Sequence, residues 1–129
     1  MTFNKCMINW KSKLQPIVAL SSAEAEYIAL CDAGKEGLWM KRFIQELGFN
    51  QNKTKIMIDN QSAMTMSKHQ MTKPRTKHIA LRYHWIREQV QNNTFELQYV
   101  PTDENIADTM TKNLNKQKFN KFFGKFLTR

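Results

Sequence analysis

The sequence is poor in acidic residues and in cysteine, and it has no long hydrophobic run. Only 11 Asp and Glu face 20 Lys and Arg among its 129 residues. Its two cysteines, Cys6 and Cys31, show neither a metal-ligand spacing nor a disulfide framework, so both are expected to be reduced thiols. No run approaches the length of a bilayer span, and the first ten residues lack a secretory pattern. We therefore expect an intracellular chain with no membrane partner.

What the sequence has in excess is positive charge. The formal net charge is +9 and the pI is near 9.7, which favours a polyanionic partner, most commonly nucleic acid. A hydrophobic content of 41% in 129 residues suffices for one domain with an ordinary core. Because carboxylates are scarce, a cluster of them in this chain would indicate a site.

Hydrophobic periodicity predicts a mixed α/β domain of the order β-β-α-β-α-α-β-α-α. The expected elements are a strand hairpin over Phe3–Trp10 and Leu14–Leu20, a helix from Ser21 to Gly48, a strand over Lys55–Ile58, a helix over Asn60–Lys68, a helix over His78–Val90, a strand over Phe95–Val100, a helix over Asn105–Thr111 and a basic amphipathic tail helix. The domain is expected to cover residues 1–112, and the tail helix residues 113–129.

Three carboxylates lie at a strand end or in the first turn of an expected helix. Glu24 follows the N-cap candidate Ser21, Asp59 follows the apolar strand, and Asp108 opens the late helix. Each has a simple local explanation. Glu24 would complete a capping box, Asp59 would be an N-cap, and Asp108 would interact favourably with the helix dipole. Together they could instead converge around divalent metal, because two-metal hydrolysis of phosphodiesters needs several converging carboxylates.

Several short segments of the sequence, taken in order, resemble the ribonuclease H domain of copia-type retrotransposon Pol polyproteins. They are Val18–Leu30 with its Ser-Ser-Ala-Glu-Ala-Glu-Tyr core, Asp59–Ala63, Arg75–Ile79, Arg82–His84, Tyr99–Thr102 and Ala107–Lys112. The resemblance extends over nearly the whole chain. It implies a ribonuclease H-like mixed sheet flanked by helices, and hydrolysis of the RNA strand of RNA–DNA hybrids during reverse transcription in the intact polyprotein.

The resemblance also implies catalytic and metal-binding roles for Glu24, Asp59 and Asp108, with Glu26 as the fallback for Glu24. The cofactor would be Mg²⁺ in a two-ion site. The family's first aspartate lies on a strand upstream of the segment that resembles Phe3–Trp10, and this sequence has no counterpart for it. We therefore expect a sheet lacking the first strand, weak Mg²⁺ binding and negligible hydrolysis by the chain alone.

A basic segment is expected to hold the phosphate backbone of the hybrid; its residues are Lys73, Arg75, Lys77, His78 and Arg82. The alternative is a solvated loop and helix face. The resemblance implies the reverse transcriptase region of the same polyprotein as a partner, in a cytoplasmic virus-like particle or the nucleus. A different hypothesis is a catalytically inactive nucleic-acid-binding or scaffold remnant of a decayed element.

Overall fold

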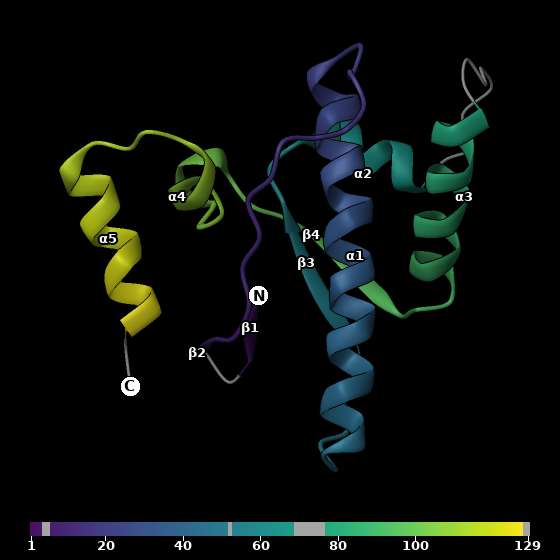
Figure 1. Ribbon diagram of the computed structural model, residues 1–129, viewed down its shortest axis with the longest axis horizontal. Helices are drawn as coiled ribbons and strands as arrows, with labels where there is room; N and C mark the ends of the chain where they lie inside the picture. The colour runs from purple at the N-terminus through teal and green to yellow at the C-terminus, as the bar shows by residue number, and fades with distance from the viewer. Residues whose placement is uncertain (4–5, 52, 69–76, 128–129) are drawn as a thin grey trace. The chain divides into compact units, whose positions relative to one another are not determined.

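A computed structural model describes residues 1–3, 6–51, 53–68 and 77–127, and of residues 77–80, 83 and 125–127 it describes the backbone alone. The described residues fall into two compact units (Figure 1). Unit 1 comprises Met1–Val18 and Pro101–Arg129, and unit 2 comprises Ala19–Val100. The mixed α/β class is confirmed, and from residue 21 onward the predicted order of strands and helices is found, with one added 3-10 turn.

Unit 2 is built on the helix α1, Ser22–Glu46, whose two ends are defined by capping. Ser21 is the N-cap, as predicted, and its hydroxyl accepts the Glu24 N–H at 3.1 Å. At the other end Gly48 has a φ of 88°, which a glycine adopts without strain. The Gly48 N–H donates to the Gln45 carbonyl at 2.9 Å and the Phe49 N–H to the Ile44 carbonyl at 3.1 Å. This pair of bonds is a Schellman motif, so the predicted stop at Gly48 is confirmed.

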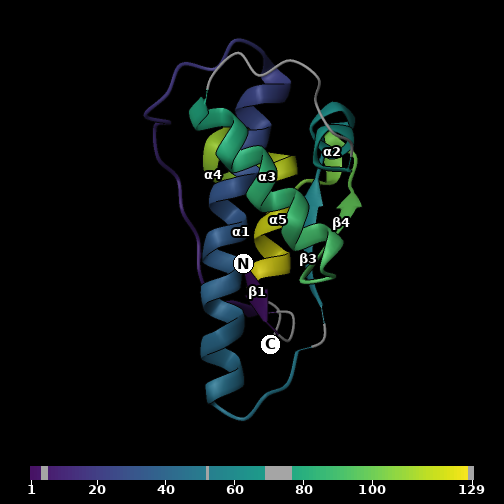
Figure 2. The same ribbon diagram turned by 90° about the vertical axis from the view of Figure 1, so that its right-hand side faces the viewer.

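Two parallel strands lie beside α1 in unit 2. Strand β3, Thr54–Ile58, pairs with β4, Phe95–Tyr99, in a register that places Thr54 opposite Phe95 and Ile58 opposite Tyr99. The helices α2, Gln61–Lys68, and α3, Lys77–Gln91, lie between the strands in the chain, as a parallel connection requires. Figures 1 and 2 show that α1 extends past the strands at its carboxyl end.

The core of unit 2 lies where α1, α3 and the strand pair meet. Its buried residues are Tyr27, Leu30, Cys31, Ile58, Ala63, Ile86, Phe95 and Leu97. Burial raises the pKa of the Cys31 thiol to about 12, so this cysteine stays a neutral apolar group. The strand predicted over Phe95–Val100 is confirmed as β4, in which Phe95 and Leu97 are buried while Glu96 and Gln98 are exposed.

Unit 1 contains the amino-terminal strands and the last helices. Strand β1, Thr2–Phe3, pairs antiparallel with β2, Cys6–Met7. The predicted strands over Phe3–Trp10 and Leu14–Leu20 are wrong, since residues 8–20 form no strand and Leu14 is 95% exposed. A strand needs a neighbour to satisfy its backbone groups, and Pro16 lacks the N–H that a ladder uses.

The last helices also differ from the expectation in one place. The helix predicted over Asn105–Thr111 is replaced by a 3-10 turn η1, Thr102–Glu104, and a short helix α4, Asp108–Thr111. The Asn105 side chain accepts the Ala107 N–H at 3.1 Å, a local turn that competes with helix formation. The tail forms α5, Lys116–Leu127. Within the described part of the chain, no helix combines the length and apolarity that crossing a bilayer requires.

At Gly34, α1 lies close to α3 and β4. A Cβ atom there would lie 2.9 Å from Ile86 Cδ1, 3.2 Å from Trp85 Cζ3 and 3.3 Å from Phe95 Cε2. Ile86 is fully buried, so its side chain has little space to move aside. Gly37, one turn later, would place a Cβ at 3.7 Å from Phe95 Cε1, an ordinary contact.

We expect Gly34→Ala to destabilise the chain and Gly37→Ala to stabilise it. Alanine favours a helix over glycine by about 1 kcal/mol, and overpacking a core costs about 1–3 kcal/mol. The free energy of unfolding in urea should therefore fall by roughly 1 kcal/mol for Gly34→Ala and rise by up to about 1 kcal/mol for the matched Gly37→Ala control. A Gly34→Ala chain as stable as Gly37→Ala would show that the close approach at Gly34 is absent in solution.

Candidate active-site carboxylates

Glu24 takes part in the predicted capping of α1 and is buried. Its Oε2 accepts the Leu20 N–H at 2.7 Å, while its own N–H donates to Ser21 Oγ. The return bond goes to Leu20 rather than to Ser21, one residue earlier than in an ordinary capping box. The carboxylate is only 8% exposed. A carboxylate has four lone-pair positions, so this bond orients the group and leaves acceptor capacity for another ligand.

Glu26, the fallback for Glu24, is exposed. Its position on α1 is two residues further along, and residues two apart on a helix do not share a face. The two glutamates therefore present their carboxylates in different surroundings, one enclosed at the start of the helix and one facing solvent.

Asp59 directly follows β3 and is half-buried. The simple explanation that Asp59 caps the next helix is wrong, because the cap is Asn60, whose Oδ1 accepts the Ala63 N–H at 2.9 Å. Among the described residues, no hydrogen bond or ion pair engages the Asp59 carboxylate. Neither helix capping nor a contact with another described residue therefore explains Asp59.

Glu24 and Asp59 belong to the same end of unit 2. The amino end of α1 and the carboxyl end of β3 lie at one end of the unit in both views (Figures 1 and 2). Glu24 is in the first turn of α1, and Asp59 is the residue after β3. The carboxyl ends of strands in α/β proteins are the usual location of ligand sites.

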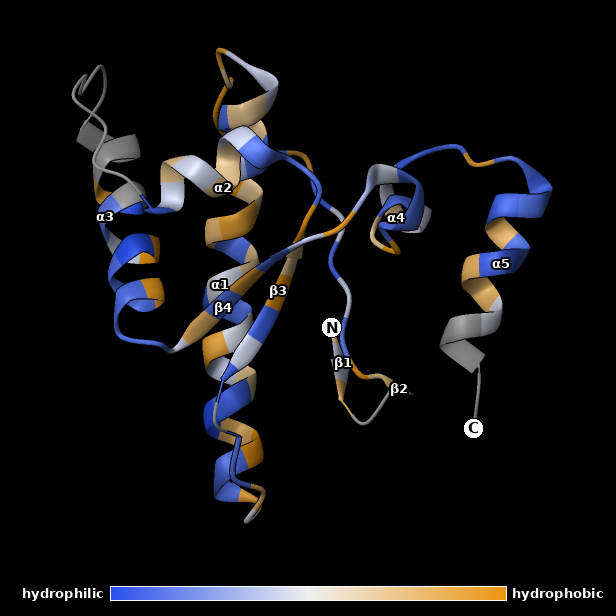
Figure 3. Cartoon of the chain, turned by 180° about the vertical axis from the view of Figure 1, so that it is seen from behind, coloured by the Kyte–Doolittle hydropathy of each residue, from blue (hydrophilic) through white to orange (hydrophobic). Residues whose placement is uncertain are grey.

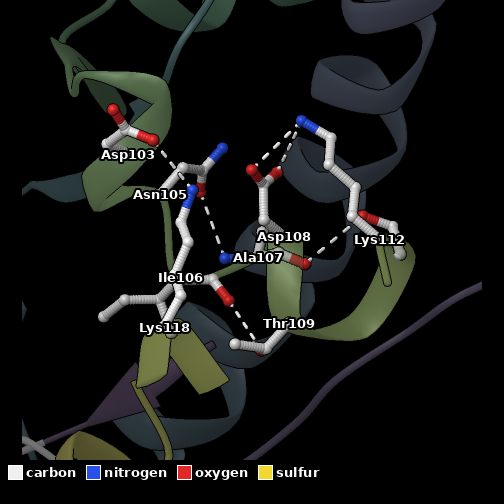
Figure 4. Close-up of polar contacts among 9 residues, drawn as sticks. Asp103, Asn105, Ile106, Ala107, Asp108, Thr109, Lys112 and Lys118 are labelled. Carbon is white, nitrogen blue, oxygen red and sulfur yellow. Dashed lines mark hydrogen bonds and ion pairs between the residues drawn. The ribbon is translucent and has the colours of Figure 1, made fainter. Parts of the chain in front are cut away.

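Asp108 is the first residue of α4, in unit 1 (Figure 4). Both of its carboxylate oxygens lie 3.0 Å from the Lys112 ammonium, one helical turn later. The Asp108 side chain is only 6% exposed and that of Lys112 is 52% exposed. This ion pair compensates the burial of the carboxylate, and the spacing of four residues could have indicated it from sequence.

Of the three predicted ligands, Glu24 and Asp59 belong to unit 2 and Asp108 belongs to unit 1. Across the parts of the chain that the structure describes, no three His, Cys, Asp or Glu side chains come together in a group able to hold a metal ion. The metal-binding roles of Glu24, Asp59 and Asp108 therefore stay predictions.

Of the five residues predicted to bind nucleic acid, the structure describes the side chain of Arg82 alone. Lys73 and Arg75 lie outside the described residues, as do the side chains of Lys77 and His78. The Arg82 side chain is described and is half-buried, and its Nη1 is buried without a hydrogen-bond partner in the structure. The Arg82 carbonyl accepts the Cys31 thiol at 3.5 Å, so this residue lies against α1.

The chain is homologous to a segment of the retrovirus-related Pol polyproteins of transposons. It is 50% identical over 118 residues to the Pol polyprotein from transposon TNT 1-94 of Nicotiana tabacum, covering 92% of this chain and 9% of that protein. The Pol polyproteins from transposons RE1 and RE2 of Arabidopsis thaliana are 36% and 37% identical, over 92% and 89% of this chain and 8% of each protein. The chain thus spans less than a tenth of these relatives. No protein-family model matches it, and no solved structure matches it.

The cap at the start of α1 can be separated experimentally from the charge of Glu24. We expect Ser21→Ala to lower the free energy of unfolding by about 1 kcal/mol, the usual value of an N-cap side chain. Glu24→Gln should cost less than Ser21→Ala, because the amide oxygen of glutamine still accepts the Leu20 N–H. Urea unfolding measures both variants. If Glu24→Gln costs more than Ser21→Ala, the fold depends on the negative charge and not only on the hydrogen bond.

Proposed function

We propose that this chain is the ribonuclease H segment of a copia-type Pol polyprotein. In the intact polyprotein it would hydrolyse the RNA strand of RNA–DNA hybrids during reverse transcription. One observation carries the proposal: Glu24 and Asp59, which have no common local role, come from the same end of unit 2. The homology to transposon Pol polyproteins supports the same conclusion.

The proposed fold is a ribonuclease H-like sheet that lacks its first strand. Support comes from the parallel pairing of β3 with β4 and from the long helix α1, which precedes them and packs on them. In this arrangement the described strand pair is one part of a larger mixed sheet. The close approach at Gly34 holds α1 on the strands, and the position of α1 in turn fixes that of Glu24.

The proposed cofactor is Mg²⁺, held by Glu24, Asp59 and Asp108. The donor set fits this ion, because carboxylate oxygens are the hard ligands that Mg²⁺ prefers. When bound, the ion activates water and stabilises the leaving oxygen. Asp59 has no competing partner among the described residues, Glu24 is oriented by the Leu20 N–H, and Asp108 would exchange its contact with Lys112.

The proposed partners follow from the same assignment. The RNA–DNA hybrid would contact Lys73, Arg75, Lys77, His78 and Arg82 through its phosphates, and the reverse transcriptase region of the polyprotein would supply the hybrid. These steps belong in a cytoplasmic virus-like particle or the nucleus. A chain that binds the hybrid without cleaving it in any context would instead be the inactive nucleic-acid-binding remnant.

Hydrolysis can be tested with the chain alone and with the chain joined to an upstream Pol segment that carries the first-strand aspartate. We expect negligible cleavage of a labelled RNA–DNA hybrid by the chain alone and Mg²⁺-dependent cleavage by the joined protein. In the joined protein, Asp59→Asn and Glu24→Gln should abolish cleavage, and the matched control Glu26→Gln should retain it. Clear cleavage by the chain alone would show that the first-strand aspartate is not needed. A fully active joined protein carrying Asp59→Asn would refute the assignment of Asp59 to the site.

Hybrid binding is a separate prediction. Charge reversal of Arg75 and Lys77 to Glu should weaken binding and lower the slope of log affinity against log salt by about one per lost phosphate contact. A suitable control is Lys53→Glu, because Lys53 is exposed, contacts Asn93 and precedes β3 at the end opposite Asp59. Fluorescence anisotropy at several salt concentrations measures the slope. An unchanged slope in the Arg75 and Lys77 variant would contradict this role.

A further inference from the structure

Unit 1 carries most of the excess positive charge of the chain. Its sequence contains nine Lys and Arg and three Asp and Glu, an excess of six in a chain whose net charge is +9. Two of the three carboxylates are held in ion pairs, Asp103 with Lys118 at 2.9 Å and Asp108 with Lys112 at 3.0 Å. The hydrogen bond from Lys118 lowers the pKa of Asp103, so this carboxylate remains charged. The helix α5 itself contains four lysines and no carboxylate.

The three phenylalanine side chains of α5 that the structure describes divide into a packed ring and an exposed pair. Phe122 is fully buried. Phe119 and Phe123, one turn apart, are stacked with ring centroids 5.4 Å apart and an interplanar angle of 17°, and they are 43% and 47% exposed. Figure 3 shows the alternation of hydrophilic and hydrophobic residues around this helix. An exposed aromatic pair on a helix without negative charge is a feature that neither the fold of unit 1 nor the proposed hydrolysis uses.

We propose that the Phe119–Phe123 pair of α5, with the exposed lysines Lys116 and Lys121, binds single-stranded nucleic acid. Bases stack on exposed aromatic rings with little sequence preference, and lysines beside the rings hold the phosphates. Lys116 and Lys121 are exposed. Lys116 lies three residues before Phe119, on the same side of the helix, whereas Lys121 is two residues from each ring and adds positive charge on another side. The ligand is therefore a single strand of RNA or DNA, distinct from the duplex hybrid.

A lipid surface fits these contacts less well. A helix that lies on a membrane inserts a broad apolar face, and here the central ring of that face, Phe122, is committed to the interior. Among the side chains of α5 that the structure describes, two rings remain outside, and they are stacked on each other. The experiment therefore also has to distinguish binding of single-stranded nucleic acid from binding of anionic lipid.

The chain offers a matched control on α1. Trp39 and Phe43 are also stacked, with centroids 5.6 Å apart, and are 59% and 44% exposed. The residues near this pair carry both signs of charge, including Glu36 and Lys41. Removing this pair deletes at least as much exposed aromatic surface as removing the α5 pair, on a helix where lysines alternate with glutamates.

The experiment measures binding of the full chain to a fluorescein-labelled single-stranded oligouridine. Phe119→Ala with Phe123→Ala should weaken binding at least about tenfold, consistent with stacking of two bases, and Trp39→Ala with Phe43→Ala should leave it unchanged. Phe119→Trp should retain binding, and the fluorescence of the new indole should be quenched by the oligonucleotide. Circular dichroism checks that each variant is folded.

The proposal is overturned if the α5 double variant binds oligouridine like the original chain, or if the α1 control loses as much affinity. It is also overturned if flotation with phosphatidylserine vesicles depends on Phe119 and Phe123 while oligonucleotide binding does not. It does not rest on hydrolysis. A chain that binds single strands through α5 while its joined form cleaves no hybrid would support this inference and refute the proposed function.

Discussion

The close approach of α1 to α3 and β4 at Gly34 is the constraint on which the arrangement of unit 2 depends. No side chain fits there, since even a Cβ would meet Ile86 at 2.9 Å. This contact lets Phe95 and Ile86 pack into the core beside α1. The amino end of α1 lies at the same end of unit 2 as the carboxyl end of β3 (Figures 1 and 2).

The two carboxylates of unit 2, Glu24 and Asp59, both come from this end of the unit. The cap explains why α1 begins at Ser22, and it orients Glu24 through the Leu20 N–H without using its second oxygen. Asp59 is available because Asn60 performs the capping of α2. Carboxylates that converge are stabilised when a cation compensates their charge. The ion pair of Asp108 with Lys112 shows such compensation in unit 1.

The sequence predicted the features that depend on local signals. The limits of α1 follow from Ser21 and Gly48, and the buried face of β4 follows from alternation. The prediction failed in residues 8–20, where a strand would need a neighbouring strand to pair with. It also failed at Asn105, whose side-chain hydrogen bond forms a turn. For the site, sequence identified Glu24, Asp59 and Asp108 one by one. Sequence alone could not show that Asn60 takes the cap, or that Gly34 packs against Ile86 and Phe95, because both depend on contacts outside the local pattern.

The most direct test is paramagnetic relaxation by Mn²⁺ in the isotopically labelled chain, since even weak binding broadens nearby amide signals. We expect the amides around Glu24 and those around Asp59 to broaden together at the same Mn²⁺ concentration, and the amide of Glu46 at the far end of α1 to stay sharp. Broadening of only one of the two segments, or of neither, would contradict the claim that Glu24 and Asp59 contribute to one metal site.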